Sequence, residues 1–589
     1  MNEILETIFG LAGGLALFLF GMNSMSDALQ KVAGEKMKQI LGFLTRNRVM
    51  GAVAGALVTA VLQSSSATTV MVIGFVSAGL MTLPQGISVI FGANIGTTMT
   101  AQLLAFKISD YIYPIIFIGF IIYFVSKNEK VKNVGMVIFS FGLLFEGIEI
   151  MGSVMKPLAS SAFFVNAMGV VADIPVLGVL LGALMTLIAQ SSSATIAILQ
   201  NFASQAAEDG VTSILGLAGA IPILLGDNIG TTITALLASI GQSKDARRTA
   251  VAHSVFNISG SVVFLFLLKP FTAFVEWLTQ VVMGITGAEV DIISREIANA
   301  HTCFNIACTI VWLFLLPLMV KIVKTIIPGD EEVQTEEISA EPRYLNDKIL
   351  VQPAAAMYLV TKELTSTSND TQVILNTTRE EVAGKDLDKA KANFDQQYNA
   401  IQSIQTQTSQ YITKLFSSGT LTEQQSEQTA ELFYVSNNLQ RISRRCGDIT
   451  QIMRGMRENN KSLSEYATQE LQECFDILID TFSHAASAVE TGNADEAKAV
   501  TADQLKLRKA EKKFNKAHLK RVKNGLCDAS LTEDFSDILY NMDRIADNCS
   551  SIAEEVLDEF NFKNLEIPDE SVEQIEKEID ETKAATTKK

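Results

Sequence analysis

Residues 1–327 alternate long apolar runs with short polar loops, whereas residues 328–589 are polar and rich in charge. A membrane-spanning helix needs about 20 predominantly apolar residues, so only the first region can cross a bilayer. The apolar runs predict spans at roughly 4–23, 84–106, 111–126, 134–151, 213–240, 249–268 and 296–320.

Two further apolar stretches, 50–82 and 177–204, each carry the polar sequence QSSSAT at their centre. A glutamine and three serines in mid-bilayer would leave polar groups unsatisfied in lipid, which is tolerated only inside protein or beside water. We therefore predict that each stretch is a re-entrant hairpin of two short helices that meet at the QSSS sequence.

Both QSSSAT stretches belong to an internal duplication. Residues 51–68 and 178–195 align without a gap at an offset of 127 residues and are identical at 11 of 18 positions. GANIGTTMTA at 92–101 follows the first copy, and GDNIGTTITA at 226–235, identical at 8 of 10 positions, follows the second. Duplicated, interrupted apolar segments are typical of transporters whose binding site lies where the two halves meet.

The basic residues orient the predicted spans, because loops rich in Lys and Arg stay in the cytoplasm. They gather near 31–48, 127–132, 244–248 and 321–324. On this path the first hairpin enters from the cytoplasm and the second from outside, so the repeats are inverted and the C-terminal region is cytoplasmic. The path requires that residues 271–294 form an external amphipathic helix and do not span.

The net charge argues against one class of partner, and the cysteine spacing argues against a disulfide framework. The net charge of −17 comes mostly from the polar C-terminal region, which argues against a nucleic-acid partner. The six cysteines form no CxxC pair and no metal-ligand cluster, which fits reduced thiols better than a disulfide framework.

The repeated polar sequences offer groups for both an anion and a cation. The QSSS amide and hydroxyls can coordinate a hard cation through oxygen and can donate hydrogen bonds to an anion. A helix that begins at QSSS adds free backbone N–H groups, which form an oxyanion site. Gly96 and Gly230 predict a helix break in each NIGTT sequence, with carbonyls freed for Na⁺. Helix packing is the better interpretation for the GxxxG pairs that begin at Gly51 and Gly178.

A hydrolase is the second hypothesis, since serines and two histidines lie in apolar segments. The sequence contains no GxSxG and no HExxH, and no acid is placed to orient either histidine. His253 and His301 occur instead in the similar sequences AHSVFN and AHTCFN, which predict structural histidines that hydrogen-bond between helices. We therefore predict no enzymatic activity.

Together, QSSSAT, GxNIGTT and AHxxFN resemble the bacterial branch of the type II sodium–phosphate cotransporters over about residues 1–326. The resemblance implies Na⁺-driven movement of inorganic phosphate, with the anion held between the two hairpin tips. The implied phosphate ligands are Gln63, Ser64, Ser65, Ser66, Ser191, Ser192 and Ser193, to which we add Asn94 and Asn228. The implied sodium ligands are Gln190, Ser191, Thr231 and Thr234, to which the NIGTT sequences add Thr97, Thr98 and Asp227.

Asp227 is the conspicuous difference between the two copies, because the first copy has Ala93 in its place. A carboxylate at this depth costs about 2.5–3.5 kcal/mol on insertion scales and is usually kept for an ion or a proton. Alternatively, Asp227 caps a helix that starts at Asn228. The sequence leaves both interpretations open.

The polar region predicts six long helices in two sets of three, at about 352–380, 387–418, 421–457, 462–492, 496–526 and 531–560. It resembles the PhoU-like domain, whose equivalent segments carry an acid–x–x–x–acid metal patch. Residues 437–449 (NNLQRISRRCGDI) are similar to residues 540–552 (YNMDRIADNCSSI), which indicates two copies of this segment. Asp543 and Asp547 of the second copy match the metal pattern, whereas the first copy has Gln440 and Arg444 there. A divalent-metal site and a solvated acidic face are therefore both open for Asp543 and Asp547.

We thus predict an all-α polytopic protein of the cell (inner) membrane, with two inverted repeats, re-entrant helical hairpins and a soluble helical bundle. Its predicted parts are a transport domain at 1–327 (repeats about 4–126 and 134–268), a linker at 328–344, a cytosolic PhoU-like domain at 345–567 and a disordered tail at 568–589. The predicted function is Na⁺-coupled phosphate symport without an organic cofactor, with a homodimer or a regulatory partner formed through the cytosolic domain. The alternatives are a membrane-anchored phosphate-status sensor and sodium-coupled export or transport of another small oxyanion.

Overall fold

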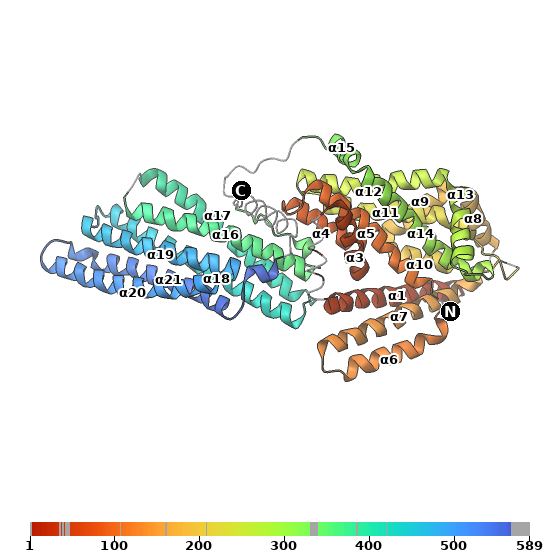
Figure 1. Cartoon of the computed structure of the whole chain (residues 1–589), viewed down its shortest axis with the longest axis horizontal. Helices are drawn as coiled ribbons and strands as arrows, with labels where there is room; N and C mark the ends of the chain where they lie inside the picture. The colour runs from red at the N-terminus through yellow and green to blue at the C-terminus, as the bar shows by residue number, and fades with distance from the viewer. Residues whose placement is uncertain are drawn as a thin grey trace, which may run out of the picture. The chain divides into compact units, whose positions relative to one another are not determined.

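The computed structural model describes residues 3–33, 37, 41, 47–106, 108–159, 162–207, 209–329, 340–384, 387–419 and 421–566. Within these ranges the chain is helical and has no β-strand, apart from one isolated bridge between Ala206 and Ser213. The chain divides into a membrane unit, residues 1–332 with 567–589, and a soluble unit, residues 333–566 (Figure 1). The predicted tail at 568–589 and residues 330–339 of the predicted linker lie outside the described residues.

The membrane unit is built from helices that differ in length. They are α1 (Glu3–Ala33), α3 (Arg48–Leu62), α4 (Ser65–Ser77), α5 (Leu83–Leu104), α6 (Ile112–Val125), α7 (Glu129–Ala159), α8 (Ala162–Asp173), α9 (Pro175–Ala189), α10 (Ser192–Ala203), α11 (Gly216–Ala238), α12 (Lys244–Phe266), α13 (Leu268–Trp277), α14 (Glu289–Phe314) and α15 (Leu316–Ile326). Helices suit a lipid bilayer, because every backbone polar group in lipid must be hydrogen-bonded within its own segment.

Six helices of the described ranges are long and apolar enough to cross a membrane, namely α1, α5, α7, α11, α12 and α14. Each of the six overlaps a predicted span, so these six predicted spans are helices of sufficient length and apolar character. The seventh predicted span, 111–126, corresponds to α6, a helix of 14 residues that packs along α7. A Cβ at Gly119 would overlap the backbone of Phe139, so α6 and α7 touch main chain to main chain. The single amphipathic helix predicted over residues 271–294 is wrong, because this range contains most of α13, the π-helix Leu278–Val282 and the start of α14 at Glu289. Helix α13 with the π-helix is too short to span.

Two pairs of short helices, α3 with α4 and α9 with α10, lie between the long helices and form the predicted hairpins. Gln63 is the C-cap of α3 and α4 begins at Ser65, and likewise Gln190 is the C-cap of α9 and α10 begins at Ser192. Both glutamines adopt the left-handed conformation, with φ of 51° and 54°, which reverses the chain in a single step. Each first arm packs closely on the long helix that follows its hairpin, α3 on α5 and α9 on α11.

The predicted helix break in the NIGTT sequences is wrong, because α5 and α11 run through them without interruption. Gly96 and Gly230 serve close packing instead. A Cβ at Gly96 would lie 2.5 Å from the Ala56 carbonyl oxygen, and one at Gly230 would lie 2.7 Å from that of Ala183. Small residues let membrane helices approach at the backbone, so these glycines bring the hairpin arms against α5 and α11.

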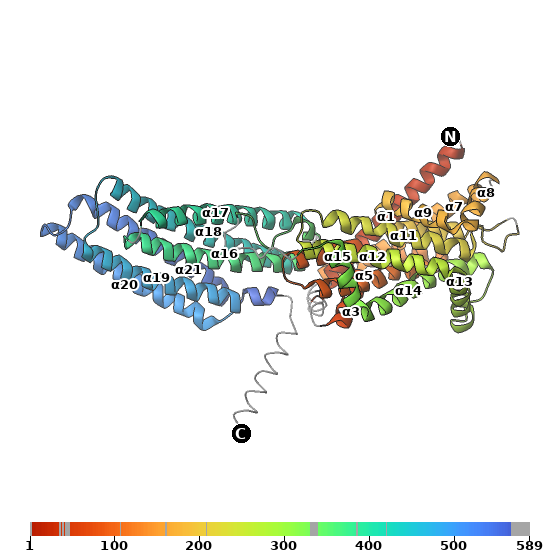
Figure 2. The same cartoon turned by 90° about the horizontal axis from the view of Figure 1, so that it is seen from above.

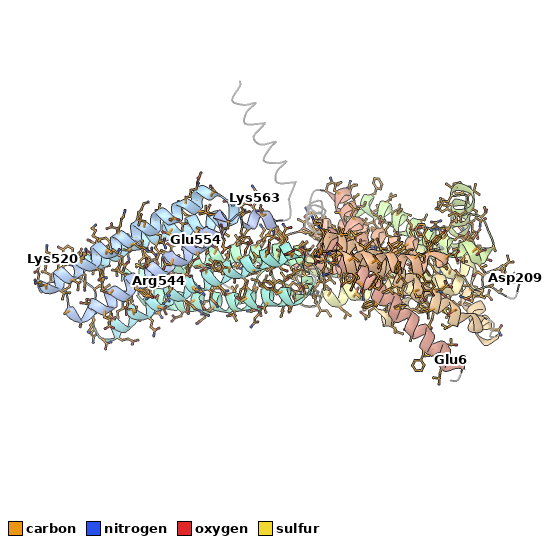
Figure 3. The ribbon with its side chains drawn as sticks, turned by 90° about the horizontal axis from the view of Figure 1, so that it is seen from below. Glu6, Asp209, Lys520, Arg544, Glu554 and Lys563 are labelled. Carbon is orange, nitrogen blue, oxygen red and sulfur yellow. The ribbon has the colours of Figure 1, made fainter. Side chains whose placement is uncertain are left out.

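The soluble unit consists of six long helices. They are α16 (Pro353–Val382), α17 (Leu387–Ser417), α18 (Glu423–Glu458), α19 (Glu465–Thr491), α20 (Ala494–Lys523) and α21 (Thr532–Leu557). Their bounds confirm the predicted helices to within a few residues. Helices α16–α18 and α19–α21 each pack together, and α18 also lies along α21 (Figure 2). The two predicted sets of three therefore share one core, while charged side chains such as Lys520 and Glu554 face outward (Figure 3).

Candidate transport site

The first hairpin tip is buried and held by its own polar groups. The Gln63 amide donates from Nε2 to the Ala60 carbonyl at 2.5 Å, and its Oε1 accepts from Thr100 Oγ1 at 2.9 Å. Ser64 caps α4 by accepting the Ala67 N–H at 3.2 Å. The N–H groups of the first helical turn, at Ser65 and Ser66, have no partner within the helix and form the positive end of its dipole. An oxyanion is stabilised at such an end.

The second tip repeats this geometry with one difference. Ser191 caps α10 by accepting the Ala194 N–H at 3.2 Å, so the N-terminal turn at Ser192 and Ser193 is oriented in the same way. Gln190, however, is exposed and donates only to the Leu187 carbonyl at 3.3 Å among the described residues. Each repeat thus provides one capped helix N-terminus. The structure describes both tips, and only in the first does the glutamine side chain also bind the following long helix, through Thr100.

One hydrogen bond joins the two repeats at these tips. Ser66 Oγ lies 3.1 Å from Thr234 Oγ1, although 168 residues separate them in the chain. The wider packing agrees, because α4 lies on α11 and α10 lies on α5. A predicted phosphate ligand and a predicted sodium ligand are therefore neighbours.

Asp227 is fully buried in the interior of α11. Its Oδ1 accepts from Thr186 Oγ1 at 2.5 Å, and Thr186 in turn lies 3.0 Å from Thr195 Oγ1. The second carboxylate oxygen, Oδ2, has no hydrogen-bond partner among the described residues. The interpretation of Asp227 as a helix cap is wrong, because α11 begins at Gly216 and no helix starts at Asn228.

The two histidines hydrogen-bond between helices, as predicted. His253 Nε2 lies 3.2 Å from Asn94 Oδ1, and His301 Nε2 lies 3.3 Å from Asn228 Oδ1. Each asparagine also donates from Nδ2 to a carbonyl one turn earlier in its own helix, Ile90 or Leu224. The asparagine side chains thus fasten α5 to α12 and α11 to α14, so we leave them out of the phosphate site proposed below.

The predicted threonines of the NIGTT sequences turn their hydroxyl protons to their own helices. Thr97 donates to Ala93 O, Thr98 to Ile95 O and Thr231 to Asp227 O, at distances of 3.2, 2.8 and 2.9 Å. Their oxygen lone pairs stay available as acceptors. The structure brings Thr231 and Thr234 onto the helix that carries Asp227, whereas Thr97 and Thr98 lie on α5.

Sequence reasoning missed the threonine pairs inside the hairpins. Thr59 Oγ1 donates to Thr68 Oγ1 at 2.8 Å in the first hairpin, and Thr186 and Thr195 form the same contact in the second. Both pairs are buried. The signal was present, because all four are identical residues at the 127-residue offset of the duplication.

Comparison with known proteins agrees with this duplicated architecture. The sequence model of the Na⁺/Pi-cotransporter family matches the chain twice, at residues 17–153 and 154–288. The chain belongs to the Na⁺/Pi-cotransporter family. A PhoU domain matches residues 471–556, which cover most of α19–α21.

Relatives of this Na⁺/Pi-cotransporter family member match shares of the chain that range from 16% to 94%. The uncharacterized protein YqeW of Bacillus subtilis is 34% identical over 265 residues, 45% of this chain and 84% of that protein. YjbB of Escherichia coli K12, named as a candidate inorganic phosphate export protein, is 24% identical over 94% of this chain and 98% of its own length. Human sodium-dependent phosphate transport protein 2B is 38% identical over 97 residues, 16% of this chain and 14% of that protein. No solved structure matches the chain.

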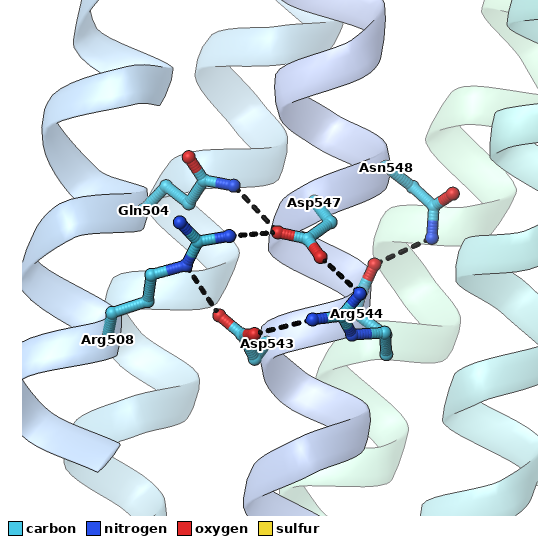
Figure 4. Close-up of polar contacts among 6 residues, drawn as sticks. All are labelled: Gln504, Arg508, Asp543, Arg544, Asp547 and Asn548. Atoms are coloured by element: carbon cyan, nitrogen blue, oxygen red, sulfur yellow. Dashed lines mark hydrogen bonds and ion pairs between the residues drawn. The ribbon is translucent and has the colours of Figure 1, made fainter. Parts of the chain in front are cut away.

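The PhoU domain of this family member does not present Asp543 and Asp547 to a metal. Arg508 donates to Asp543 at 3.1 Å and to Asp547 at 2.7 Å, and Arg544 donates to the other oxygens of both carboxylates at 3.1 and 2.7 Å (Figure 4). Within the described part of the chain, no group of three or more metal-ligating side chains occurs. Two guanidinium groups occupy the place of a cation, so these residues do not fit a divalent-metal site in this arrangement.

Proposed function

We propose that this protein moves inorganic phosphate across the cell membrane by alternating access, coupled to Na⁺. The duplicated hairpin tip supports the proposal, because each repeat carries a capped helix N-terminus and a run of serines, and Ser66 of the first repeat lies 3.1 Å from Thr234 of the second. The proposed phosphate ligands are Gln63, Ser64, Ser65, Ser66, Ser191, Ser192 and Ser193. Neutral donors and helix dipoles bind an anion and can still release it, as a transport site must.

The sodium ligands that we propose surround the second hairpin. Gln190, Ser191, Thr231 and Thr234 supply neutral oxygens, and the unpaired Oδ2 of Asp227 supplies a negative one. A hard cation prefers oxygen ligands of this kind. Because Ser66 contacts Thr234, a cation bound there would draw α11 and the first hairpin tip together, which supports coupling between Na⁺ and phosphate.

The direction of transport follows from the ion gradients, since one site serves import and export alike. With Na⁺ higher outside, a symporter of this kind takes phosphate up. The relative YjbB is named as a candidate exporter, so direction must be measured on this chain itself.

Reconstitution in proteoliposomes tests the proposed function. We expect uptake of labelled phosphate that rises with an inward Na⁺ gradient and stays at background with an equal K⁺ gradient. Uptake that is identical in Na⁺ and K⁺ would contradict coupling to sodium. Phosphate binding without any flux in either direction would favour a membrane-anchored sensor over a transporter.

Cysteine labelling tests the inverted topology. In a chain whose six native cysteines are replaced, we expect single cysteines at Ser109 and Ala207 to react with an impermeant maleimide from outside. A cysteine at Asn128 should react only after the membrane is opened, because it lies in a loop rich in lysine. Reaction of all three positions from the same face would exclude inverted repeats.

A further inference from the structure

The soluble unit contains a pocket of about 710 Å³ between α17, α18 and α21. Four arginines line it, Arg441, Arg444, Arg445 and Arg544, together with Tyr398 and the two carboxylates Asp448 and Asp547. The pocket lies wholly inside the soluble unit. It is therefore separate from the transport site.

The arginines of this pocket are only partly neutralised. Arg441 is exposed and makes no hydrogen bond or ion pair with the described residues, and Arg444 reaches only Gln402, at 3.4 Å. Arg445 pairs with Asp448 at 3.2 Å. In Arg544 the terminal nitrogens pair with Asp543 and Asp547, but the buried Nε has no partner among the described residues.

The positive excess is notable in a chain whose net charge is −17. Guanidinium groups that lack a carboxylate partner match phosphoryl groups, which accept their N–H donors in bidentate pairs. A divalent cation would meet repulsion in the same pocket. The two similar segments differ in sign here, since Arg444 in α18 stands where α21 has Asp547.

The volume and the aromatic lining set the size of the ligand. Pockets of about 300–1,000 Å³ are typical for drug-sized ligands, so this one holds more than a single phosphate ion. The Tyr398 ring stacks on Phe394 with centroids 5.6 Å apart. Gly447 allows it to lie against α18, because a Cβ there would come within 2.9 Å of the ring. The Tyr398 ring lines the pocket beside the arginines, and an aromatic side chain there suits contact with a planar base.

We propose that this pocket binds a polyphosphorylated small molecule of nucleotide size. Arg441 and Arg444 contact the phosphoryl groups, and the part of Tyr398 that lines the pocket contacts the base. The fraction of pockets occupied would then follow the concentration of phosphorylated metabolites, the compounds into which transported phosphate is incorporated or from which it is released.

Calorimetry on the full chain in lipid nanodiscs tests the proposal, with metal-free ATP, pyrophosphate and inorganic phosphate in EDTA as probes. We expect ATP to bind one per chain. We expect the doubly substituted Arg441→Gln/Arg444→Gln protein to bind it at least about tenfold more weakly, because it loses charged hydrogen bonds to the phosphoryl groups. Lys520→Gln, the same loss of charge at an exposed position of α20, should leave the affinity unchanged. Tyr398→Ala should weaken ATP more than pyrophosphate.

Three results would overturn the proposal. The first is equal ATP affinity in the wild-type chain and the double arginine variant, both folded by circular dichroism. The second is absence of ATP binding to the wild-type chain. The third is equal affinity for ATP and pyrophosphate that Tyr398→Ala does not change, which would assign the pocket to an inorganic anion. Inorganic phosphate is titrated in a Ser192→Trp background, so that the hairpin site does not contribute heat.

Discussion

Ser65→Trp and Ser192→Trp should each reduce phosphate transport to the level of empty vesicles. Both serines open the second arm of a hairpin, where the backbone N–H groups of the first helical turn face the proposed anion. An indole ring at either place would fill the space in front of those donors. Flux of labelled phosphate in proteoliposomes measures the effect.

Two controls separate loss of the site from loss of the fold. Val262→Trp puts the same bulky side chain on an exposed position of α12 and should transport normally. Because Ser65 is only 4% exposed, overpacking can cost about 1–3 kcal/mol there. Ser65→Ala, which keeps the space and removes the hydroxyl, is the folding control and should insert normally with weakened phosphate binding. Wild-type flux in both tryptophan variants would show that the hairpin tips do not hold phosphate.

Asp227→Asn should raise the Na⁺ concentration needed for half-maximal transport by at least about tenfold, which is about 1.4 kcal/mol of binding free energy. The carboxylate is fully buried, and its Oδ2 has no partner among the described residues, so a cation is the group that would offset its desolvation. Asparagine keeps the shape and the hydrogen bond from Thr186 but removes the charge. Phosphate affinity measured at saturating Na⁺ should change much less.

Thr186→Val is the matched control for this prediction. It removes the 2.5 Å hydrogen bond to Asp227 and leaves the charge in place. If the charge binds sodium, Asp227→Asn should act on Na⁺ activation far more strongly than Thr186→Val. Equal effects of the two variants, or unchanged Na⁺ activation in Asp227→Asn, would reduce Asp227 to a packing role.

The hairpins and most spans could be predicted from the sequence because the physical constraint is local. Long apolar helices are stable in a bilayer, whereas a lipid-exposed QSSS sequence is not. Both features can be recognised in a short stretch of sequence, without knowledge of distant contacts. The NIGTT sequences misled the prediction for an equally physical reason. Glycine both loosens a helix and allows a neighbour to approach, and only the position of α3 beside α5 shows that Gly96 does the second.

Partners that lie far apart in the sequence could not be predicted. Ser66 meets Thr234 across 168 residues, and Asp227 meets Thr186 across 41. The acid pair at Asp543 and Asp547 looked like a metal patch because Arg508, which pairs with both, comes from another helix. In each case the sequence shows the residue types, but only the structure shows the contacts that decide their role.

The unequal hairpin tips bear on the energy balance between conformations. Gln63 accepts from Thr100 in the first repeat, whereas Thr234, the equivalent of Thr100, lies beside Ser66 and not Gln190. Exchanging these roles between the repeats would pair Gln190 with Thr234 and Ser193 with Thr100, so the same number of polar contacts would form. If the protein alternates between two such arrangements, we expect their free energies to be close, and each difference of about 1.4 kcal/mol would change their ratio tenfold. Substitutions that distinguish the repeats, such as Ala93 against Asp227, would then set the resting ratio, and small differences in ligand affinity would be enough to reverse it.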